Sequence, residues 1–403
     1  MWVLYLALLA QSANLLEDGN KALDAKQYDR AIQLFTQAAT ADPKDYAAHF
    51  QLALTYSLLG RDHDAISQYR ATLDLEPGLY EAELNLGLSL MRTHDPAGAL
   101  PHFKVAAEQK PKEFQPALGL AQALYSTDHF ADAEGAYRTA AALDPRSAAA
   151  ESGLAMSLIR QKRADEAAPH VQQAFTLDRS YRAGFVALAE LYEATGRTAE
   201  AITFYRMFPD DPVALDRLGA LLLASDMPTE AIQALEAAYE RNPLNGRRIL
   251  LAQAYVRGKQ LAKAQAVLLA AVQAAPNDLD LRLFYGRVLR DQRKFSEAAE
   301  QFSAATRIRP DAVVAWNELA GALVIAEQYP EALAALDHVR TLGPESPGNL
   351  FFRAMAYDRL RRRKEALENY NKFLAASQGK FPDQEFQARQ RARTLENDLK
   401  NKR

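Results

Sequence analysis

The sequence predicts an all-α solenoid of about eleven antiparallel helix pairs, because residues of one kind recur about every 34 positions. One column is alanine in all eleven copies, with intervals of 34 residues except for one of 30 and one of 33. These residues are Ala31, Ala65, Ala99, Ala133, Ala167, Ala201, Ala231, Ala264, Ala298, Ala332 and Ala366. A fixed period is read before any single motif, since it decides the architecture.

Two further columns support the repeat. Every residue twelve positions before a column alanine is Gly or Ala: Gly19, Ala53, Gly87, Ala121, Ala155, Ala189, Gly219, Ala252, Gly286, Ala320 and Ala354. In eight copies a proline stands twelve positions after it: Pro43, Pro77, Pro111, Pro145, Pro243, Pro276, Pro310 and Pro344. Proline at this place predicts the end of a helix, because it pushes the preceding residue out of α geometry.

Each period contains two apolar stretches, both too long for strands. In the second period, the stretch before the loop at 60–62 carries Phe50, Leu52, Leu54, Tyr56 and Leu58. The stretch after the loop carries Ile66, Tyr69, Leu73 and Leu75 at helical spacing. Two helices joined by so short a turn pack antiparallel, and the two small columns predict a close crossing of their backbones. One pair cannot bury its apolar face alone, so neighbouring pairs are expected to stack.

These residues resemble the tetratricopeptide repeat family, whose pattern has an early aromatic, Leu-Gly, Tyr, Ala, a second aromatic, a small residue and Pro. Repeat ten matches at Trp316, Leu319, Ala320, Leu323, Ala332, Leu336 and Pro344. Repeat two matches at Leu52, Ala53, Tyr56, Ala65, Tyr69 and Pro77. The resemblance covers residues 12–379 and implies a right-handed superhelical solenoid that serves as a protein-interaction scaffold.

The repeats are expected to run from residue 12 to residue 380, with the sixth shorter than the others. They are 12–45, 46–79, 80–113, 114–147, 148–181, 182–211, 212–244, 245–278, 279–312, 313–346 and 347–380. Pro209 and Pro212 should stop the second helix of repeat six early, and Asp211 should cap the next helix. We predict a hinge there, between an N-terminal array (12–211) and a C-terminal array (212–380). A tolerated deletion without functional meaning is the alternative.

Residues 1–12 are predicted to be a signal or an apolar N-terminal segment. Trp2 to Leu9 is continuously apolar but too short to span a bilayer as a helix. Ala10 and Ser12 fit the small-x-small cleavage pattern of a secretory signal, although no Lys or Arg precedes the run. A signal would make the protein exported or periplasmic in a bacterium. If the segment instead packs on repeat one as an extra apolar turn, a cytoplasmic location is expected.

Residues 381–403 are predicted to form a polar capping helix, because a solenoid needs a polar cover on its last repeat. Only Phe386 and Leu395, together with Ala392 and Leu399, are expected to face the core. This segment has a basic excess, as has the run 359–364, which contains Arg359, Arg361, Arg362, Arg363 and Lys364. Such runs are usually solvated, and the alternative is contact with an acidic partner or with phospholipid.

The composition argues against several classes of function. The net charge is −3, from 48 basic and 51 acidic residues, so the sequence lacks the basic excess that is typical of nucleic-acid binding. The absence of cysteine excludes disulfides and thiolate metal sites. His63, His94 and His129 fall near successive turns, but helices packed about 8–10 Å apart cannot share one ion. No phosphate loop or nucleophile elbow is present. We therefore expect no enzyme activity, no cofactor and no metal.

Function is therefore sought on the concave face, which the resemblance assigns to the first helix of each repeat. By register, this face is largely apolar in repeats two to five and basic in repeats eight and nine. The predicted peptide-binding residues are Phe50, Leu54, Leu84, Leu88, Met91, Leu118, Gln122, Tyr125, Met156, Arg257, Arg287 and Arg290. Gln122 and Gln115 could hydrogen-bond a peptide backbone, and the arginines could pair with carboxylates. Alternatively, the apolar residues simply fill the bore of a tight superhelix.

Two sets of ligand-binding residues that occur in the groove of family members are not matched by this sequence. The carboxylate clamp and the asparagine ladder both need residues that are missing here, where Asn20 and Asn85 stand alone. We expect a non-catalytic scaffold, without a transmembrane span, that binds a peptide or a helical segment of another protein in the concave groove. The alternative is an envelope-assembly or secretion accessory, or a regulatory subunit of a separately encoded enzyme, that acts through other faces.

Overall fold

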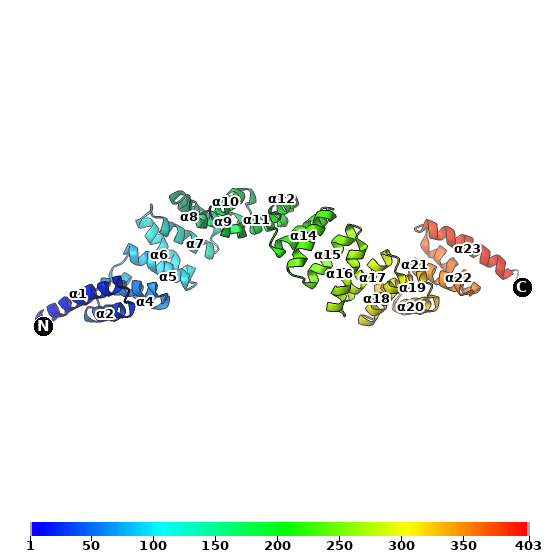
Figure 1. The fold of residues 1–403 in the computed structure, drawn as a ribbon, viewed down its shortest axis with the longest axis horizontal. Helices are drawn as coiled ribbons and strands as arrows, with labels where there is room; N and C mark the ends of the chain where they lie inside the picture. Colours follow the sequence, from blue (N-terminus) through cyan, green and yellow to red (C-terminus); the bar gives the residue numbers. More distant parts are fainter. Residues whose placement is uncertain (1, 401–403) are drawn as a thin grey trace. The chain divides into compact units, whose positions relative to one another are not determined.

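The computed structural model describes residues 2–400, with side chains from residue 11 onward. These residues form 23 α-helices, one short 3-10 helix and no strand. The chain divides into two units, residues 1–204 and 205–403, which are described separately. In each unit, helices follow one another as stacked antiparallel pairs, which confirms the predicted all-α solenoid (Figure 1). Within residues 2–400, no helix is both long enough and apolar enough to cross a membrane.

The helices of the first unit alternate between the first member of each pair, called helix A, and the second, called helix B. The A helices are α1 Trp2–Asp24, α3 Tyr46–Leu58, α5 Tyr80–Arg92, α7 Phe114–Ser126, α9 Ala148–Arg160 and α11 Ala183–Ala194. The B helices are α2 Tyr28–Ala41, α4 Asp62–Leu75, α6 Pro96–Gln109, α8 Phe130–Leu143, α10 Ala164–Leu177 and α12 Thr198–Tyr205. The 3-10 helix η1 (Arg179–Arg182) precedes α11.

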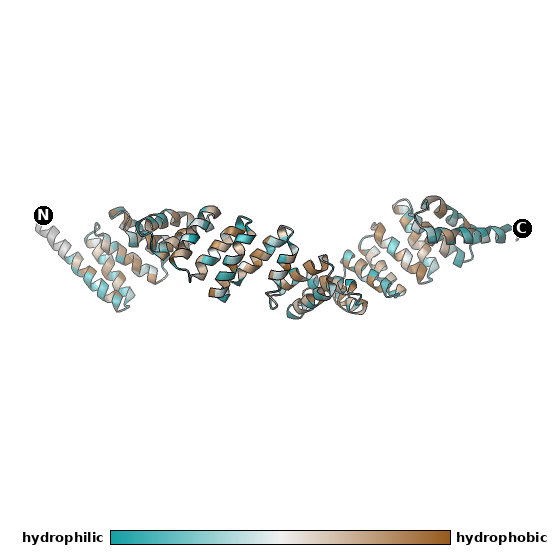
Figure 2. Cartoon of the chain, turned by 90° about the horizontal axis from the view of Figure 1, so that it is seen from above, coloured by the Kyte–Doolittle hydropathy of each residue, from teal (hydrophilic) through white to brown (hydrophobic). Residues whose placement is uncertain are grey.

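The second unit continues the same alternation and adds a last helix. Its A helices are α13 Pro212–Ala224, α15 Asn245–Arg257, α17 Leu279–Asp291, α19 Val313–Ile325 and α21 Pro347–Arg359. Its B helices are α14 Pro228–Arg241, α16 Leu261–Ala274, α18 Phe295–Ile308, α20 Tyr329–Leu342 and α22 Arg363–Ser377. The last helix is α23, Pro382–Lys400, which is largely hydrophilic (Figure 2).

The small-residue columns lie in the core. All eleven column alanines of the B helices, from Ala31 to Ala366, are 0% exposed. The Gly and Ala residues twelve positions earlier, on the A helices, are buried as well. A glycine on helix A lies against the large residue four positions after the column alanine: a Cβ on Gly286 would come within 2.5 Å of the Phe302 ring. The small residues of helix A therefore make room for a ring of helix B.

Phe103 of α6 shows how neighbouring repeats share this arrangement. Its ring is fully buried and lies between two glycines, Gly87 of its own repeat and Gly119 of the next. A Cβ would come within 2.8 Å of the ring at Gly87 and within 2.5 Å at Gly119. Because the ring has no free space, both the packing within the pair and the stacking of the next pair depend on it.

Substituting alanine for two helical glycines should give effects of opposite sign. Gly119→Ala should lower the free energy of unfolding by about 1–3 kcal/mol, because the new methyl group overpacks against Phe103. Gly135→Ala in α8 should raise it by about 0.5–1 kcal/mol, because nothing lies within 4 Å and alanine favours the helix. Urea unfolding followed by circular dichroism measures both, and a stabilised Gly119→Ala protein would contradict the packing described here.

The turn between helix A and helix B is left-handed in every repeat. One residue of each turn has positive φ, five positions before the column alanine. These residues are Lys26, Gly60, His94, Asp128, Lys162, Gly196, Asp226, Lys259, Arg293, Glu327 and Arg361. Only two are glycine, the residue that adopts this conformation most easily. The turn thus has the same geometry throughout, and in nine repeats a residue with a side chain adopts it.

The irregular sixth repeat has the expected local structure. Helix α12 has 8 residues, whereas the B helices on either side have 14. Pro212 opens α13, and the Asp211 carboxylate accepts hydrogen bonds from the backbone N–H groups of Val213 and Ala214. The shortened helix and the new cap are therefore confirmed. The hinge, and the array boundaries set at residues 211 and 212, remain predictions.

The capping helix has a different buried face from the predicted one. Ala392 and Leu395 are buried as expected, but Phe386 is 64% exposed, so its assignment to the core is wrong. Ala388, which is 0% exposed, occupies the core position instead. Since Ala388 stands 34 residues after Ala354, it continues the small column, and α23 has the register of a twelfth helix A. Residues 401–403 of the expected cap lie outside the described residues.

The predicted N-terminal segment begins at Met1, which lies outside the described residues. From Trp2 the backbone is helical and continuous with the rest of α1. Ser12 is buried, and its hydroxyl donates a hydrogen bond to the carbonyl of Ala38 in α2 at 3.3 Å. Cleavage near residue 12, export and the cytoplasmic alternative all remain predictions.

Glu134 of α8 joins repeats four and five. Glu134 is 7% exposed, and its carboxylate accepts hydrogen bonds from Arg138 at 2.6 Å, Gln161 at 2.9 Å and Arg163 at 2.6 Å. Burial alone would raise the pKa of Glu134, but these three donors together hold its pKa below the ordinary value of 4.5.

Acid should therefore weaken this contact between repeats. The unfolded chain takes up a proton at Glu134 at a higher pH than the folded chain, so the stabilisation is present above pH 4.5 and is lost as the pH falls through the folded pKa. The Glu134→Gln protein should lose less stability than the unmodified protein between about pH 5 and about pH 3. Urea midpoints across this range measure the difference, and equal losses in the two proteins would contradict it.

Candidate partner-binding surfaces

Helix A lies on the inner side of each unit. Neighbouring A helices approach one another, α3 with α5, α5 with α7 and α7 with α9 in the first unit, and α13 with α15 and α19 with α21 in the second. In the described part of the chain, neighbouring B helices make no comparable approach. Helices that are closer together lie on the concave side of a stack, so the surface of the A helices is the inner face.

The nine residues predicted for the inner face of the first unit share one degree of burial. All are half-buried: Phe50, Leu54, Leu84, Leu88, Met91, Leu118, Gln122, Tyr125 and Met156. The side chains of Phe50, Leu84, Leu88 and Met91 pack on the buried cluster around Phe103. These four side chains thus contact the core and also keep part of their surface exposed.

Two glutamines lie among these apolar residues. Gln115 is exposed and Gln122 is half-buried, both on α7. Neither amide has a hydrogen-bond partner among residues 2–400, whereas Gln161 in the next repeat is bonded to Glu134. Their amide groups are available to the backbone of a bound segment, which an apolar strip alone would leave without partners.

The predicted arginines of the second unit are already paired within the chain. Arg287 Nε donates to Glu318 Oε1 at 2.7 Å, and an Nη of Arg290 donates to Glu318 Oε2 at 2.6 Å. Arg257 lies 3.8 Å from Asp226, and both side chains are largely exposed. This role of Glu318 was not predicted. Glu318 lies on the next helix A and supplies the carboxylate that was expected from a partner. Only Arg257 remains weakly engaged.

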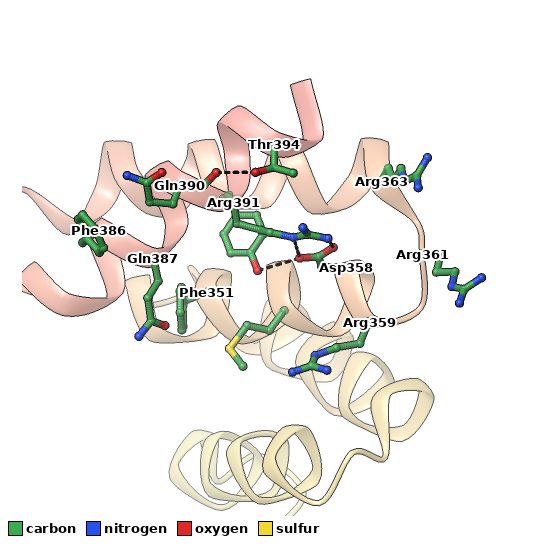
Figure 3. Close-up of a pocket in the computed structure, with 12 residues that line it drawn as sticks. Phe351, Asp358, Arg359, Arg361, Arg363, Phe386, Gln387, Gln390, Arg391 and Thr394 are labelled. Carbon is green, nitrogen blue, oxygen red and sulfur yellow. Dashed lines mark hydrogen bonds and ion pairs between the residues drawn. The ribbon is translucent and has the colours of Figure 1, made fainter. Parts of the chain in front are cut away.

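The structure contains a second candidate binding surface, which was not predicted from the sequence. A pocket of 870 Å³ lies between α21, α22 and α23 and is here called the C-terminal pocket (Figure 3). Its lining consists of Phe351, Met355, Asp358, Arg359, Arg361, Arg363, Tyr370, Phe386, Gln387, Gln390, Arg391 and Thr394. Its size is in the range of small-ligand sites, about 300–1,000 Å³.

One ion pair spans the centre of the C-terminal pocket. Arg391 of α23 donates from Nε and Nη to the two oxygens of Asp358 in α21, at 2.5 and 2.8 Å. The Tyr370 hydroxyl donates to Asp358 at 3.4 Å. These hydrogen bonds from Arg391 to Asp358 hold the pKa of Arg391 above its ordinary value. The pair ties the capping helix to the last repeat, and it leaves Arg359 and Arg361 of the lining to solvent or to a ligand.

The basic run that lines this pocket was visible in the sequence, but the pocket was not. The prediction placed Phe386 in the core, so no aromatic residue was expected on the exposed side of α23. The arginines were therefore predicted to be solvated. The 34-residue spacing from Ala354 to Ala388 was the signal that could have fixed the register of α23 and turned Phe386 outward.

The histidines form no shared site. His63, His94 and His129 are exposed, as expected for turn residues. His102 and His170 each bond through Nδ1 to a glutamate nineteen residues earlier, Glu83 at 2.6 Å and Glu151 at 2.7 Å. Within the described residues, no three His, Asp or Glu side chains gather closely enough to hold a metal ion.

Family models match most of the sequence. Residues 5–248 match the model described as the cilia and flagella-associated protein 70 C-terminal domain. Residues 222–288 and 285–349 match two models described as tetratricopeptide repeat. No curated protein matches the sequence.

Solved structures match parts of the chain. YrrB, described as a TPR protein with an unusual peptide-binding site, is 16% identical with a TM-score of 0.40, over 41% of this chain and 85% of its own. MamA from Desulfovibrio magneticus RS-1 is 19% identical with a TM-score of 0.39, over 42% and 96%. MamA AMB-1 is 24% identical with a TM-score of 0.40, over 42% and 99%.

Proposed function

The chain belongs to the tetratricopeptide repeat family, and over residues 5–248 to the family described as the cilia and flagella-associated protein 70 C-terminal domain; from this premise we propose a specific scaffold function. Tetratricopeptide repeat proteins bind other proteins, and their scaffold families are generally non-catalytic. The proposal is that this chain is a non-catalytic scaffold. It binds a peptide or a helical segment of a partner protein along the inner face of α3, α5, α7 and α9.

One observation carries the proposal. The eight apolar residues predicted for this face remain half-buried after the repeats have stacked, and they follow one another from α3 to α9. Burying the rest of their surface would contribute about 25 cal/mol for each Å² of apolar area. Isolated exposed apolar residues are normal on a protein surface, but a continuous strip marks a place where another molecule binds.

The arrangement of polar groups is consistent with a polypeptide ligand. Gln115 and Gln122 stand within the strip with amides that are free to donate and to accept. An extended peptide or the end of a helix presents backbone N–H and C=O groups that need such partners when they leave water.

The test is a pair of substitutions on the inner face. Leu84→Glu combined with Leu118→Glu should reduce capture of partner proteins from the native host at least tenfold, because two charges would enter the apolar strip. Captured proteins are identified by mass spectrometry, and helicity is measured by circular dichroism.

Leu73→Glu is the matched control. Leu73 is half-buried and packs on the same cluster as Leu84, but it lies on helix B. Its substitution should disturb the core to a similar degree and leave capture intact. If the inner-face pair keeps full capture, or if Leu73→Glu abolishes it equally, the inner face is not the binding surface.

A further inference from the structure

We propose that the C-terminal pocket binds an acidic peptide segment that also carries an aromatic or aliphatic side chain. The carboxylates would pair with the arginines of the pocket, and the apolar side chain would lie against its phenylalanines. The pocket lies wholly in the second unit, so this site is separate from the inner face of α3 to α9 and does not depend on the function proposed for that face.

The charge of the pocket fits a ligand with several carboxylates. Four arginines line it, against the single acid Asp358. Arg391 is held by Asp358, and Arg363 reaches Asp398 only at 3.7 Å.

The other two arginines are free. Arg359 and Arg361 are exposed and have no acidic partner among residues 2–400. Guanidinium groups pair with carboxylates through two parallel hydrogen bonds, which gives direction as well as attraction. Two unpaired guanidinium groups beside a paired one therefore form a receptor for acidic side chains.

The apolar part of the pocket does not fit a ligand that carries charged groups but no apolar group. Three apolar residues line it: Phe386 is 64% exposed, Met355 is half-buried and Phe351 is 9% exposed. Figure 3 shows Phe386 and Phe351 toward one end of the pocket and Arg361 and Arg363 at the opposite end. Phe386 makes no contribution to the core, yet an exposed phenylalanine favours contact with another apolar group. The ligand must therefore carry an apolar group beside its negative charges.

A peptide fits these requirements better than a nucleic acid. The chain has a net charge of −3, and the arginine cluster is confined to one pocket instead of forming the stripe that a phosphate backbone needs. A simple anion such as phosphate would occupy only the arginine end. A segment in which Asp or Glu flanks Phe or Leu supplies both chemistries within a few residues.

The experiment uses the full chain and a fluorescein-labelled peptide, Asp-Glu-Asp-Phe-Asp-Glu-Asp, in a fluorescence-anisotropy titration at low salt. The unmodified protein should bind this peptide at least tenfold more tightly than the peptide with Asn and Gln in place of the acids. It should bind it at least threefold more tightly than the peptide with Ala in place of Phe. Failure of either comparison would overturn the proposal.

The protein variants separate the pocket from general attraction to charge. Arg359→Ala with Arg361→Ala should weaken binding at least tenfold, and Phe386→Ala at least threefold; all three side chains are exposed, so the fold should remain. The matched control is Arg293→Ala, because Arg293 is an exposed left-handed turn residue like Arg361, with φ of 63° and 60°. Its affinity should change less than twofold, and an equal loss would contradict a specific site.

Two further measurements decide the remaining alternatives. Inorganic phosphate, or a single-stranded oligonucleotide of equal charge, should displace the peptide only at much higher concentration, and displacement at equal concentration would show a site for anions in general. Leu84→Glu with Leu118→Glu should leave peptide affinity unchanged. If the protein does not bind the acidic peptide but still captures partners through the inner face, only this proposal fails. If it binds the peptide but the inner-face variant keeps full capture, only the proposed function fails.

Discussion

Replacing Phe103 with alanine should lower the free energy of unfolding by about 3–5 kcal/mol, one of the largest losses that a single substitution can cause here. The ring is 0% exposed and lies between Gly87 and Gly119. Neither glycine has a side chain that could move into the space, so the cavity would stay open. Because the ring belongs to one repeat and contacts the next, the loss should appear in the stacking of repeats three and four.

Urea unfolding, with hydrogen exchange to locate the opening, measures this loss. Phe386→Ala is the control, because that ring is 64% exposed and its removal should change the unfolding free energy by no more than about 0.5 kcal/mol. A cost at Phe386 equal to that at Phe103 would contradict the register found for α23. A loss below about 1 kcal/mol at Phe103 would mean that the neighbouring helices close the gap.

The second large effect is expected where the buried Arg353 of α21 pairs with Glu345 of the preceding loop and with Asp337 of α20. Arg353 is 3% exposed and donates from Nε and Nη to Glu345 at 3.0 and 2.7 Å, and from its other Nη to Asp337 at 2.7 Å. Arg353→Met should lower the unfolding free energy by about 3–5 kcal/mol, because it leaves the carboxylate of Glu345, whose side chain is only 11% exposed, without a counter-charge.

Two further variants show whether the unpaired charge is the cause. Adding Glu345→Gln to Arg353→Met should restore part of the loss, since the buried group is then neutral. Arg340→Met removes a partner of the same Asp337 at 3.4 Å, but both side chains are more than half exposed, so its effect should stay within about 1 kcal/mol. If the double variant is less stable than Arg353→Met, the loss arises from packing instead.

The sequence predicted the parts of the fold that repeat. The eleven alanines, the small column and the prolines each mark a position at which the backbone allows few residue types, so their spacing gave the helix pairs and their ends. The left-handed turns were harder to see, because nine of the eleven carry an ordinary side chain at positive φ. Their position was fixed by the column alanine five residues later, and residue type at the turn gave little information.

The candidate surfaces were predicted less well, since they depend on contacts between repeats. The register of helix A identified the inner face, but it could not show that Glu318 would engage Arg287 and Arg290 from the next repeat. Likewise, the basic run at 359–364 was evident, but the C-terminal pocket requires the orientation of α23, which a polar helix with few apolar residues does not reveal. In the structure, the buried Ala388 shows that orientation. In the sequence, a single alanine at this position is weak evidence for it.

Site-specific photo-crosslinking tests most directly whether a partner lies along the inner face. A benzophenone side chain at Gln122, on the inner face of α7, replaces a half-buried polar residue that has no bonded partner within the described chain. The same group at Lys104 of α6, which is exposed on helix B, is the control. In the native host, crosslinks to one partner protein from position 122 and none from position 104 are expected. Crosslinks from position 104 alone would show that the partner binds another face, and the inner-face scaffold would have to be abandoned.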